Sequence, residues 1–361
     1  MSKKKIAYVT NNIAPFRVML LDELAKYADV TLFYVHEIEE GVKAEYVRLR
    51  PVHAKLQSIT RLGLSRTFQQ LKEMDMVFFD GYTGREKMLL MSYMWLTGRP
   101  YAISVDGMID RKSTSIKQKL LDRIKSYALG RAKFVLSTNQ STDVCIRRLS
   151  HKARIKRHIF STLLKDDIKK IEVVDLNTIF SKYGIQKTEK NLLFVGRFIK
   201  EKGVIELLSF MKEQKSDPSI QLIMVGGTKE ELEAFEKDLP SNIHIIPFLE
   251  KLEILELMRA ADVFVLPTHS DTWGLVIVEA LSVGIPIIST NRCNAALEFI
   301  KNGKNGYLMQ ELTTVELASK LNATLRLDAE QVARYNQCLM QDYNLEGSAK
   351  NLMSILEDSH V

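Results

Sequence analysis

The chain has 361 residues, or roughly two domains if a domain is taken as about 150 residues. With 46% hydrophobic residues, 26% charged residues and no low-complexity tract, its composition excludes a disordered chain. Its three cysteines (Cys145, Cys293 and Cys338) lie far apart, which argues against a disulfide framework or a cysteine zinc site and fits a reducing compartment.

The chain opens with three lysines, as a signal peptide can, but the apolar run that follows, Ile6–Val9, is too short for a hydrophobic signal core. The longest apolar helical stretch, Met88–Leu96, is far below the ~20 residues that span a bilayer. We therefore expect a cytoplasmic protein that lies at most on the inner face of a membrane.

Short apolar runs alternate with amphipathic helices along the whole chain. In the first half the runs are Ile6–Val9, Val30–Val35, Met76–Phe79, Tyr101–Ser104 and Phe134–Leu136, and in the second half they are Leu192–Val195, Gln221–Val225, His244–Ile246, Val263–Leu266 and Ile287–Ser289. Such runs are typical of parallel strands buried on both faces. Two successive sets predict an α/β chain with a doubly wound, Rossmann-like domain over residues 1–165 and another over 166–345. A helix over 346–361 can cross back to the first domain.

Basic residues gather in the second part of the first domain, although the net charge is only +7. No acidic residue occurs between Val144 and Leu164, where six cations crowd together, and the amphipathic helix Ile116–Leu129 carries Lys117, Lys119 and Arg123. This field can attract phospholipid headgroups, nucleic acid or a polyphosphate substrate. A solvated face next to a linker explains the same charges equally well.

Two cations flank the turn that follows the first strand of the second half. Gly196 lets the backbone turn, and Arg197 and Lys202 lie five residues apart before the next helix. Their charged groups can converge on one anion, for which a diphosphate is the natural candidate. By spacing alone, two surface charges remain the simpler interpretation.

A second group surrounds a predicted helix start at Gly274. The N–H groups of Gly274 and Leu275 are available to an anion, as at any helix N-terminus. Asp271 lies in the preceding loop, and Glu279 lies inside the helix, where its carboxylate can accept hydrogen bonds from vicinal hydroxyls. The alternative is that Asp271 caps the helix and Glu279 is a partly buried structural carboxylate.

Taken together, these segments resemble the carboxyl-terminal domain of family-4 retaining glycosyltransferases, which have the two-domain GT-B fold. The resemblance rests on Gly196-Arg197, Glu201-Lys202-Gly203, Asp271…Glu279, Gly284-Ile-Pro286, and Glu298…Asn302-Gly303 with Gly306. The loop Asn11–Arg17 is similar to that of members that build bacterial surface polysaccharides. The resemblance implies two Rossmann-like domains facing each other across a cleft. It also implies transfer of a sugar from a nucleotide donor, with UDP-sugars favoured, to a saccharide or a polyprenyl-diphosphate-linked saccharide in capsule, exopolysaccharide or O-antigen synthesis.

On the donor side, the resemblance implies that Arg197 and Lys202 bind the diphosphate, with help from the backbone at Gly196, Gly274 and Leu275. Glu279 would hold the ribose hydroxyls, close to the loop at Thr228 and the segment near Phe248. Asp271 stands where the family has a glutamate and would contact the transferred sugar.

On the acceptor side, the resemblance implies that Asp106, which follows the fourth strand, faces the reacting carbon. Asn12, Pro15 and Arg17 would line the acceptor site or the cleft between the domains.

The chain has no Asp-x-Asp metal motif, so we expect neither a metal nor another cofactor. The expected partners are the nucleotide sugar, the acceptor and an anionic membrane surface, without nucleic acid. Two other functions stay open: a nucleotide-sugar epimerase on the same fold, and a basic nucleic-acid-binding protein. A dinucleotide-dependent dehydrogenase would need Gly-x-Gly-x-x-Gly after a strand, which is absent after the first strand of either half.

Overall fold

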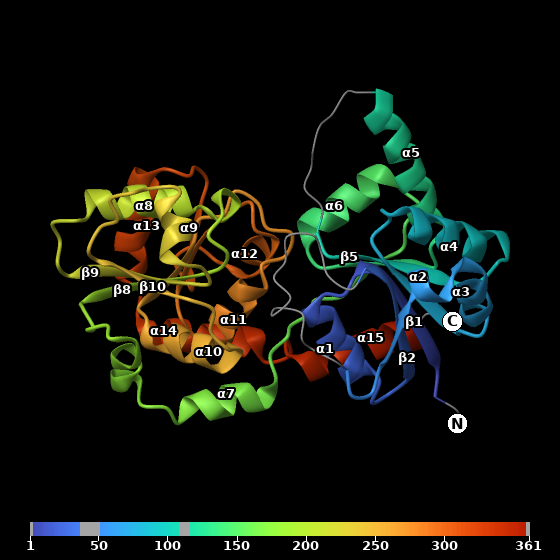
Figure 1. Ribbon diagram of the computed structural model, residues 1–361, viewed down its shortest axis with the longest axis horizontal. Coiled ribbons are helices and arrows are strands. Elements are labelled where there is room, and N and C mark those ends of the chain that lie inside the picture. The colour runs from blue at the N-terminus through green and yellow to red at the C-terminus, as the bar shows by residue number, and fades with distance from the viewer. Residues whose placement is uncertain (1–2, 37–50, 108–115, 359–361) are drawn as a thin grey trace. The chain divides into compact units, whose positions relative to one another are not determined.

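Parallel strands form the centre of each half of the chain (Figure 1). The computed structural model describes residues 3–36, 51–107 and 116–358. The chain divides into two compact units: Met1–Thr162 together with Tyr343–Val361, and Leu163–Asp342. Each unit is described by itself below.

Within the described residues, the first unit has one seven-stranded sheet in the order β3-β2-β1-β4-β5-β6-β7, with every pair parallel. Its strands are β1 (Lys5–Asn12), β2 (Asp29–His36), β3 (Lys55–Ser58), β4 (Met76–Asp80), β5 (Tyr101–Val105), β6 (Phe134–Ser137) and β7 (Ile155–Arg157). The strand order reverses between β1 and β4, so the loops that follow these two strands diverge and leave a crevice at the carboxyl edge of the sheet.

Helices flank this sheet and supply the other half of its core. They are α1 (Pro15–Leu24), α2 (Ile59–Leu62), α3 (Leu64–Leu71), α4 (Arg85–Leu96), α5 (Ile116–Arg131), α6 (Gln140–Leu149) and α15 (Leu345–Asp358). One face of the sheet buries Val9, Phe33 and Phe79 against Leu90 and Met94 of α4. This burial explains the near-continuous apolar runs of the central strands.

The last helix belongs to the first unit, although its sequence follows the second one. Helix α15 packs against α1, as Figure 1 shows. Ser161 donates its backbone N–H to Ser348 Oγ at 3.2 Å, and His158 Nδ1 lies 2.9 Å from Asn351 Oδ1. Burial lowers the pKa of His158 to about 4, so this histidine is neutral at physiological pH.

Within the described residues, the second unit has a six-stranded parallel sheet in the order β10-β9-β8-β11-β12-β13. Its strands are β8 (Lys190–Val195), β9 (Ile220–Val225), β10 (Ile243–Ile246), β11 (Val263–Leu266), β12 (Ile287–Thr290) and β13 (Gly306–Met309). Its α-helices are α7 (Lys165–Glu172), α8 (Val204–Glu213), α9 (Lys229–Glu233), α10 (Lys251–Ala260), α11 (Leu275–Val283), α12 (Asn294–Phe299), α13 (Thr314–Thr324) and α14 (Ala329–Met340), and its 3₁₀ turns are η2 (Leu176–Thr178), η3 (Phe180–Tyr183) and η4 (Lys200–Lys202). The strand order reverses between β8 and β11, so the loops after these strands are the expected ligand-binding edge.

The predicted fold class, two doubly wound parallel α/β units, is confirmed. Three strands are absent from the prediction: β3, β7 and β13, each at an outer edge of its sheet. Edge strands are buried on fewer sides, so they can be short and partly polar, as Lys-Leu-Gln-Ser in β3 and Ile-Lys-Arg in β7 are.

Candidate active site

The turns after β8 and β9 contain glycines that no larger residue can replace. Gly203 has φ +78°, and a Cβ there would lie 1.9 Å from the carbonyl oxygen of Pro267 in the loop after β11. Gly226 has φ +112°, and a Cβ there would lie 2.7 Å from the carbonyl oxygen of Gly196. The loops after β8, β9 and β11 therefore approach to within backbone contact at the carboxyl edge of the sheet.

The two predicted cations of this turn differ in their surroundings. Arg197 is exposed and makes no ion pair with any residue that the structure describes. Lys202 ends the 3₁₀ turn η4, and its Nζ lies 2.5 Å from Asp271 Oδ2, with 19% and 15% of the two side chains exposed. The structure thus joins two residues, 69 positions apart, that the sequence assigned to a phosphate and a sugar.

Helix α11 begins at Leu275 with Gly274 as its N-cap residue, close to the predicted start, and has no side-chain cap. Gly274 has φ +91°, and a Cβ there would lie 2.5 Å from Cys293 Sγ, so only glycine fits. Burial raises the pKa of the Cys293 thiol to about 12, which leaves it neutral beside Asp271. The uncapped amides at the start of α11, Leu275 among them, lack an intrahelical acceptor and suit an anion.

Glu279 lies half-buried on α11, and its charge acts on Lys251 at the start of α10. Burial lowers the pKa of the Lys251 ammonium, and the carboxylates of Glu279 and Asp167 oppose that shift. Lys251 was not among the predicted site residues. The sequence around Lys251 does not distinguish it from an ordinary first residue of an amphipathic helix.

The loop after β11 is fastened to the turn before α8 by several hydrogen bonds. Thr268 Oγ1 and the backbone N–H of His269 both donate to the carbonyl of Glu201, at 2.7 and 2.8 Å. His269 Nε2 lies 2.8 Å from Glu206 Oε1. These bonds hold the Asp271 loop and the Lys202 turn in a fixed relation.

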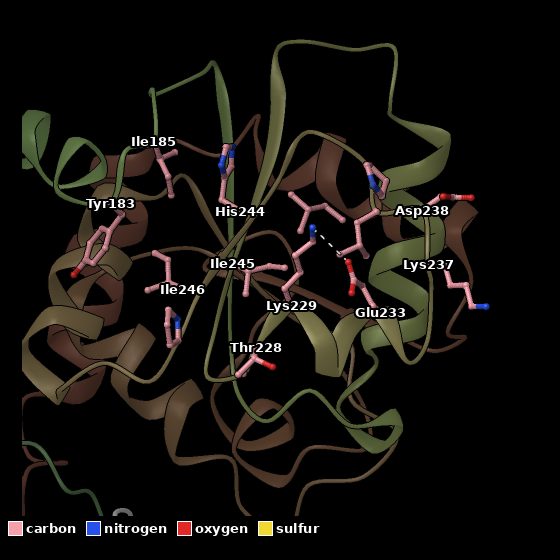
Figure 2. Close-up of a pocket in the computed structure, with 15 residues that line it drawn as sticks. Tyr183, Ile185, Thr228, Lys229, Glu233, Lys237, Asp238, His244, Ile245 and Ile246 are labelled. Atoms are coloured by element: carbon pink, nitrogen blue, oxygen red, sulfur yellow. Dashed lines mark ion pairs between the residues drawn. The ribbon is translucent and has the colours of Figure 1, made fainter.

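A cavity of about 760 Å³ opens along the edge strand β10 of the same unit (Figure 2). His244, Ile245 and Ile246 lie along it, with Tyr183 on one side and Asp238 on the other. It borders Gly227 and Thr228, the loop expected beside the base and ribose, where Thr228 caps α9 by accepting from the Glu231 N–H. Its lining does not include Arg197, Lys202 or Glu279.

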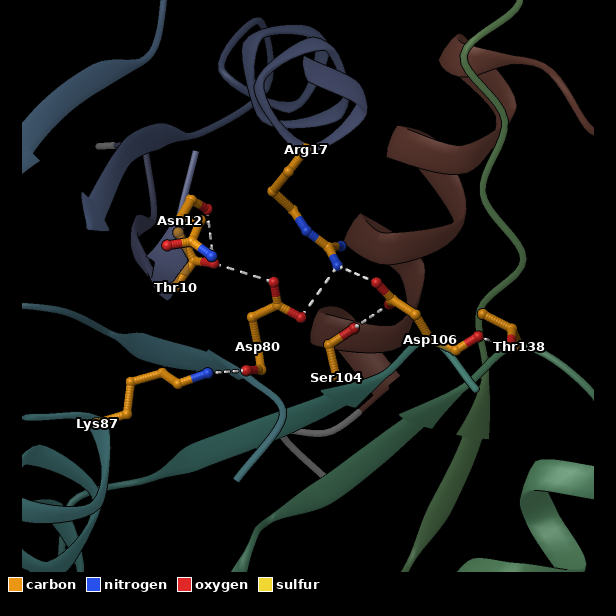
Figure 3. Close-up of polar contacts among 8 residues, drawn as sticks. All are labelled: Thr10, Asn12, Arg17, Asp80, Lys87, Ser104, Asp106 and Thr138. Atoms are coloured by element: carbon orange, nitrogen blue, oxygen red, sulfur yellow. Dashed lines mark hydrogen bonds and ion pairs between the residues drawn. The ribbon is translucent and has the colours of Figure 1, made fainter. Parts of the chain in front are cut away.

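In the first unit, a buried arginine joins two carboxylates at the carboxyl edge of the sheet (Figure 3). Arg17 Nη2 lies 2.7 Å from Asp106 Oδ2 and 3.3 Å from Asp80 Oδ1. Only 2% of the Arg17 side chain is exposed, against 18% for Asp106 and 26% for Asp80. The cation is therefore buried beside two carboxylate side chains that are partly exposed.

Arg17 was expected to line the acceptor site or the cleft between the domains, and its guanidinium lies in the interior of the first unit. It contacts the rings of Tyr8, Phe16 and Phe160 instead, with its Cζ 4.7 Å from the Tyr8 centroid. Any effect of Arg17 on a ligand would pass through Asp80 and Asp106. Asn12 and Pro15 are half-buried at the end of β1 and the start of α1, where proline suits the first helical position.

Further contacts fix both carboxylates. Thr10 Oγ1 donates to Asp80 Oδ2 at 3.1 Å, Ser104 Oγ donates to Asp106 Oδ1 at 3.3 Å, and the ammonium of Lys87 donates to the Asp80 carbonyl. Burial raises the pKa of Asp106, Arg17 opposes the shift, and the charge of Asp80 adds to it. Asp80 was not predicted, although it ends an apolar strand run in the same way that Asp106 follows one.

We expect Arg17→Lys to lower the free energy of unfolding by about 1–2 kcal/mol, because the ammonium cannot reproduce the planar group that stacks on Tyr8 while reaching both carboxylates. Urea unfolding followed by circular dichroism measures the change. Arg85→Lys, at an exposed arginine of α4, is the matched control. Equal midpoints for the two variants would contradict a stabilising role for the Arg17 pairs.

The part of the chain that the structure describes holds no group of three or more His, Cys, Asp or Glu side chains placed to bind a metal. In the same residues, no helix has the length and apolar content needed to cross a bilayer.

Comparison with known proteins places the second unit in a family. Residues 175–338 match the family described as glycosyl transferases group 1. The N-acetyl-alpha-D-glucosaminyl L-malate synthase of Bacillus anthracis is 29% identical over 40% of this chain and 39% of its own length. The lipopolysaccharide glucosyltransferase WaaG of Escherichia coli is 30% identical over 40% of this chain and 38% of its own length. The chain thus spans about two-fifths of the length of these curated relatives.

Solved structures match the whole chain at low sequence identity. HepE of Anabaena, solved in complex with UDP, superposes with a TM-score of 0.71 at 17% identity and covers 98% of this chain and 100% of that one. The structure of WaaG gives a TM-score of 0.68 at 16% identity over 97% of this chain and 99% of that one. The fold is therefore GT-B, and residues 175–338 of this chain match the glycosyl transferases group 1 family.

Proposed function

We propose that this protein is a retaining glycosyltransferase that moves a sugar from a nucleoside diphosphate donor to an acceptor hydroxyl. UDP-sugars are the favoured donors, and the acceptor is a saccharide or a polyprenyl-diphosphate-linked saccharide in capsule, exopolysaccharide or O-antigen synthesis. The proposed reaction requires no metal and no cofactor. The capsular polysaccharide glycosyltransferase CapM of Staphylococcus aureus, 28% identical over 36% of this chain and 34% of its own length, supports this assignment.

One observation carries the proposal: the groups suited to a leaving diphosphate and a bound sugar come together in the second unit. Lys202 Nζ forms an ion pair with Asp271 Oδ2 at 2.5 Å. The N-cap of α11, Gly274, lies three residues after Asp271 and has no side-chain cap. Arg197 is exposed on the same turn as Lys202. Two cations and a helix N-terminus form an anion site, and a carboxylate beside it can hold a sugar hydroxyl.

In the proposed reaction, the acceptor hydroxyl attacks the anomeric carbon on the face from which the diphosphate leaves. A phosphate oxygen of the donor takes the hydroxyl proton, so the protein need not supply a strong base. Lys202, Arg197 and the amides at Gly274 and Leu275 offset the negative charge that grows on the diphosphate. Such prearranged charge stabilisation is often the largest single catalytic effect.

Asp106 is proposed as a hydrogen-bond partner of the acceptor hydroxyl or the donor sugar. Asp106→Asn is then expected to lower kcat by about 10-fold or more while changing donor KM little, because the amide keeps the shape but loses the charge. Steady-state kinetics measure the two constants, and Asp166→Asn, at a carboxylate with 76% of its side chain exposed, is the control. An unchanged kcat would indicate that Asp106 serves only as a counter-ion of Arg17 and has no role in the reaction.

The first unit is proposed to meet an anionic membrane on the inner face of the plasma membrane. On α5, Lys119 and Arg123 are exposed next to exposed Leu120 and Leu121, whereas the side chain of Lys117 lies outside the described residues. Binding to vesicles that contain anionic lipid should fade as salt rises and weaken when Lys119 and Arg123 are neutralised. Sedimentation measures it, and equal binding to neutral vesicles would contradict the proposal.

The two alternative functions, an epimerase and a nucleic-acid-binding protein, predict different experimental results. An epimerase would convert the nucleotide sugar without passing radiolabel to an acceptor, so label in the acceptor product separates the enzymes. A nucleic-acid-binding protein would bind duplexes with a steep salt dependence and ignore nucleotide sugars. The relatives named above are a malate glycoside synthase and glycosyltransferases, which supports neither alternative.

A further inference from the structure

A small apolar cavity lies between α4 and α5 in the first unit. Its volume is about 140 Å³, and its walls include Met88, Met91, Trp95, Ile124 and Tyr127. An apolar cavity of about 150 Å³ stays dry and can take up a benzene-sized molecule. The space therefore suits a short segment of an aliphatic chain rather than a sugar.

The two helices that line this cavity also expose large apolar side chains. Leu96 on α4 is 72% exposed and Leu120 on α5 is 59% exposed, and Leu89 and Leu121 are exposed on the same two helices. Isolated apolar residues are common on protein surfaces, so the cavity itself carries the argument.

Two cations stand beside the aromatic walls. The Arg131 guanidinium lies 5.0 Å from the ring centroids of both Trp95 and Tyr127, and Lys125 Nζ lies 5.5 Å from the Tyr82 ring. Lys125 also pairs with Asp122 at 3.4 Å, whereas Arg131 has no carboxylate partner among the residues that the structure describes. The rim therefore carries positive charge that an anionic group attached to an apolar chain can neutralise.

The segment from β4 to α4 carries residues of both the cavity and the carboxylate cluster of Figure 3. Lys87 donates to the Asp80 carbonyl, and the next residue, Met88, lines the cavity. Tyr82, two residues after Asp80, lines it as well.

We propose that this cavity binds the aliphatic chain of a lipid-linked acceptor at the segment next to its phosphate, with that phosphate on Arg131. The inference rests on the proposed function, and it assigns the acceptor's lipid to specific residues. A bilayer phospholipid is the competing occupant that the experiment has to exclude.

Intrinsic fluorescence provides the readout, because the protein has two tryptophans. Trp95 lines the cavity, and Trp273 is 4% exposed in the second unit. Farnesyl diphosphate, a short soluble isoprenoid with the expected anionic head, should change the emission in a saturable way. The change should be absent in Trp95→Phe, and a change that persists in that variant would overturn the assignment.

Two variants locate the binding. Ser92→Leu adds bulk inside the cavity at an exposed helical serine, with Ser209→Leu on α8 as the matched control. Arg131→Gln removes the unpaired charge, with exposed Arg326→Gln as its control. Each test variant should weaken the binding of farnesyl diphosphate at least ~10-fold. Ser92→Leu should do so because every methylene that loses its burial is a factor of about four, and Arg131→Gln because it removes the charge proposed to hold the phosphate. Equal affinity in tests and controls would overturn the site.

Related probes identify the ligand. Inorganic diphosphate should leave Trp95 emission unchanged, and farnesol should bind at least ~10-fold more weakly than farnesyl diphosphate. Dihexanoyl phosphatidylglycerol below its micelle concentration should also bind more weakly, whereas binding as tight as that of farnesyl diphosphate would overturn the acceptor assignment in favour of a bilayer lipid.

UDP release from a UDP-sugar is measured separately. Release without saturable binding would overturn this site alone, and binding without release would overturn the donor proposal alone.

Discussion

Replacing Lys202 with alanine is expected to lower kcat by about 100-fold or more, because a fixed donor aimed at a developing oxyanion contributes on the order of 3 kcal/mol. The structure sharpens this expectation, since Lys202 is bound to Asp271 at 2.5 Å. The substitution removes a cation and also leaves a carboxylate uncompensated near the leaving group. Lys200→Ala, two residues away at an exposed position of the same turn, is the control and should keep nearly full activity.

Arg197→Ala should cause a loss of the same size, and Arg197→Lys should recover only part of it, because an ammonium lacks the planar fork that bonds two phosphate oxygens. All these activities should persist in excess EDTA, which is the shared test of a reaction that relies on cations of the chain. Activity that vanishes with EDTA and returns with Mg²⁺ or Mn²⁺ would overturn the roles of Arg197 and Lys202.

The ion pair allows a further check. If the unpaired carboxylate contributes to the loss, Lys202→Ala combined with Asp271→Asn should lose less activity than the sum of the two single losses in free energy. Residues in direct contact commonly show such non-additivity. Strict additivity would mean that Lys202 and Asp271 act independently and that their contact has no functional weight.

The second large effect is expected at Glu279, whose carboxylate is proposed to accept hydrogen bonds from both ribose hydroxyls. Hydrogen bonds to a charged group contribute about 1.5–3 kcal/mol each, so Glu279→Ala should lower kcat/KM by about 100-fold or more. Glu279→Gln keeps an acceptor and should mainly raise donor KM.

The fold should survive both changes, because Glu279 is only half-buried on α11. Thermal unfolding checks this, and Glu330→Ala, at an 85% exposed glutamate of α14, serves as the matched control for kinetics and stability. Transfer at the wild-type rate by Glu279→Ala would place the donor pocket elsewhere in the unit, for which the cavity along β10 is the next candidate.

The central strands could be predicted from the sequence because a strand that is buried on both faces is a continuous run of apolar residues, as in Ile6–Val9 of β1 and Val263–Leu266 of β11. The edge strands β3, β7 and β13 have no such apolar run, whereas β10, also at an edge, has one and was predicted. In β13, for example, Tyr307 and Leu308 are only half-buried, and the strand follows the turn-rich segment Asn302–Asn305.

The sequence predicts positions just after a strand, as for Asp106 directly after β5 and Arg197 two residues after β8. It does not predict which partner a side chain meets through packing. Lys202 meets Asp271 across 69 residues, and Arg17 meets Asp106 across 89. Periodicity predicts which face of an element is buried, whereas these pairs depend on which elements become neighbours. The sequence could therefore suggest Arg17 as a site residue but could not predict that its side chain is buried.

The place of α15 in the first unit has a consequence for how the protein is made. Helix α1 packs against α15, yet the ribosome completes the whole of Leu163–Asp342 between them. At about 5–20 residues per second, α1 therefore waits on the order of ten seconds or more for its partner. The second unit is continuous in sequence and can fold during that interval. The half of the protein that is translated first is consequently the last to be completed.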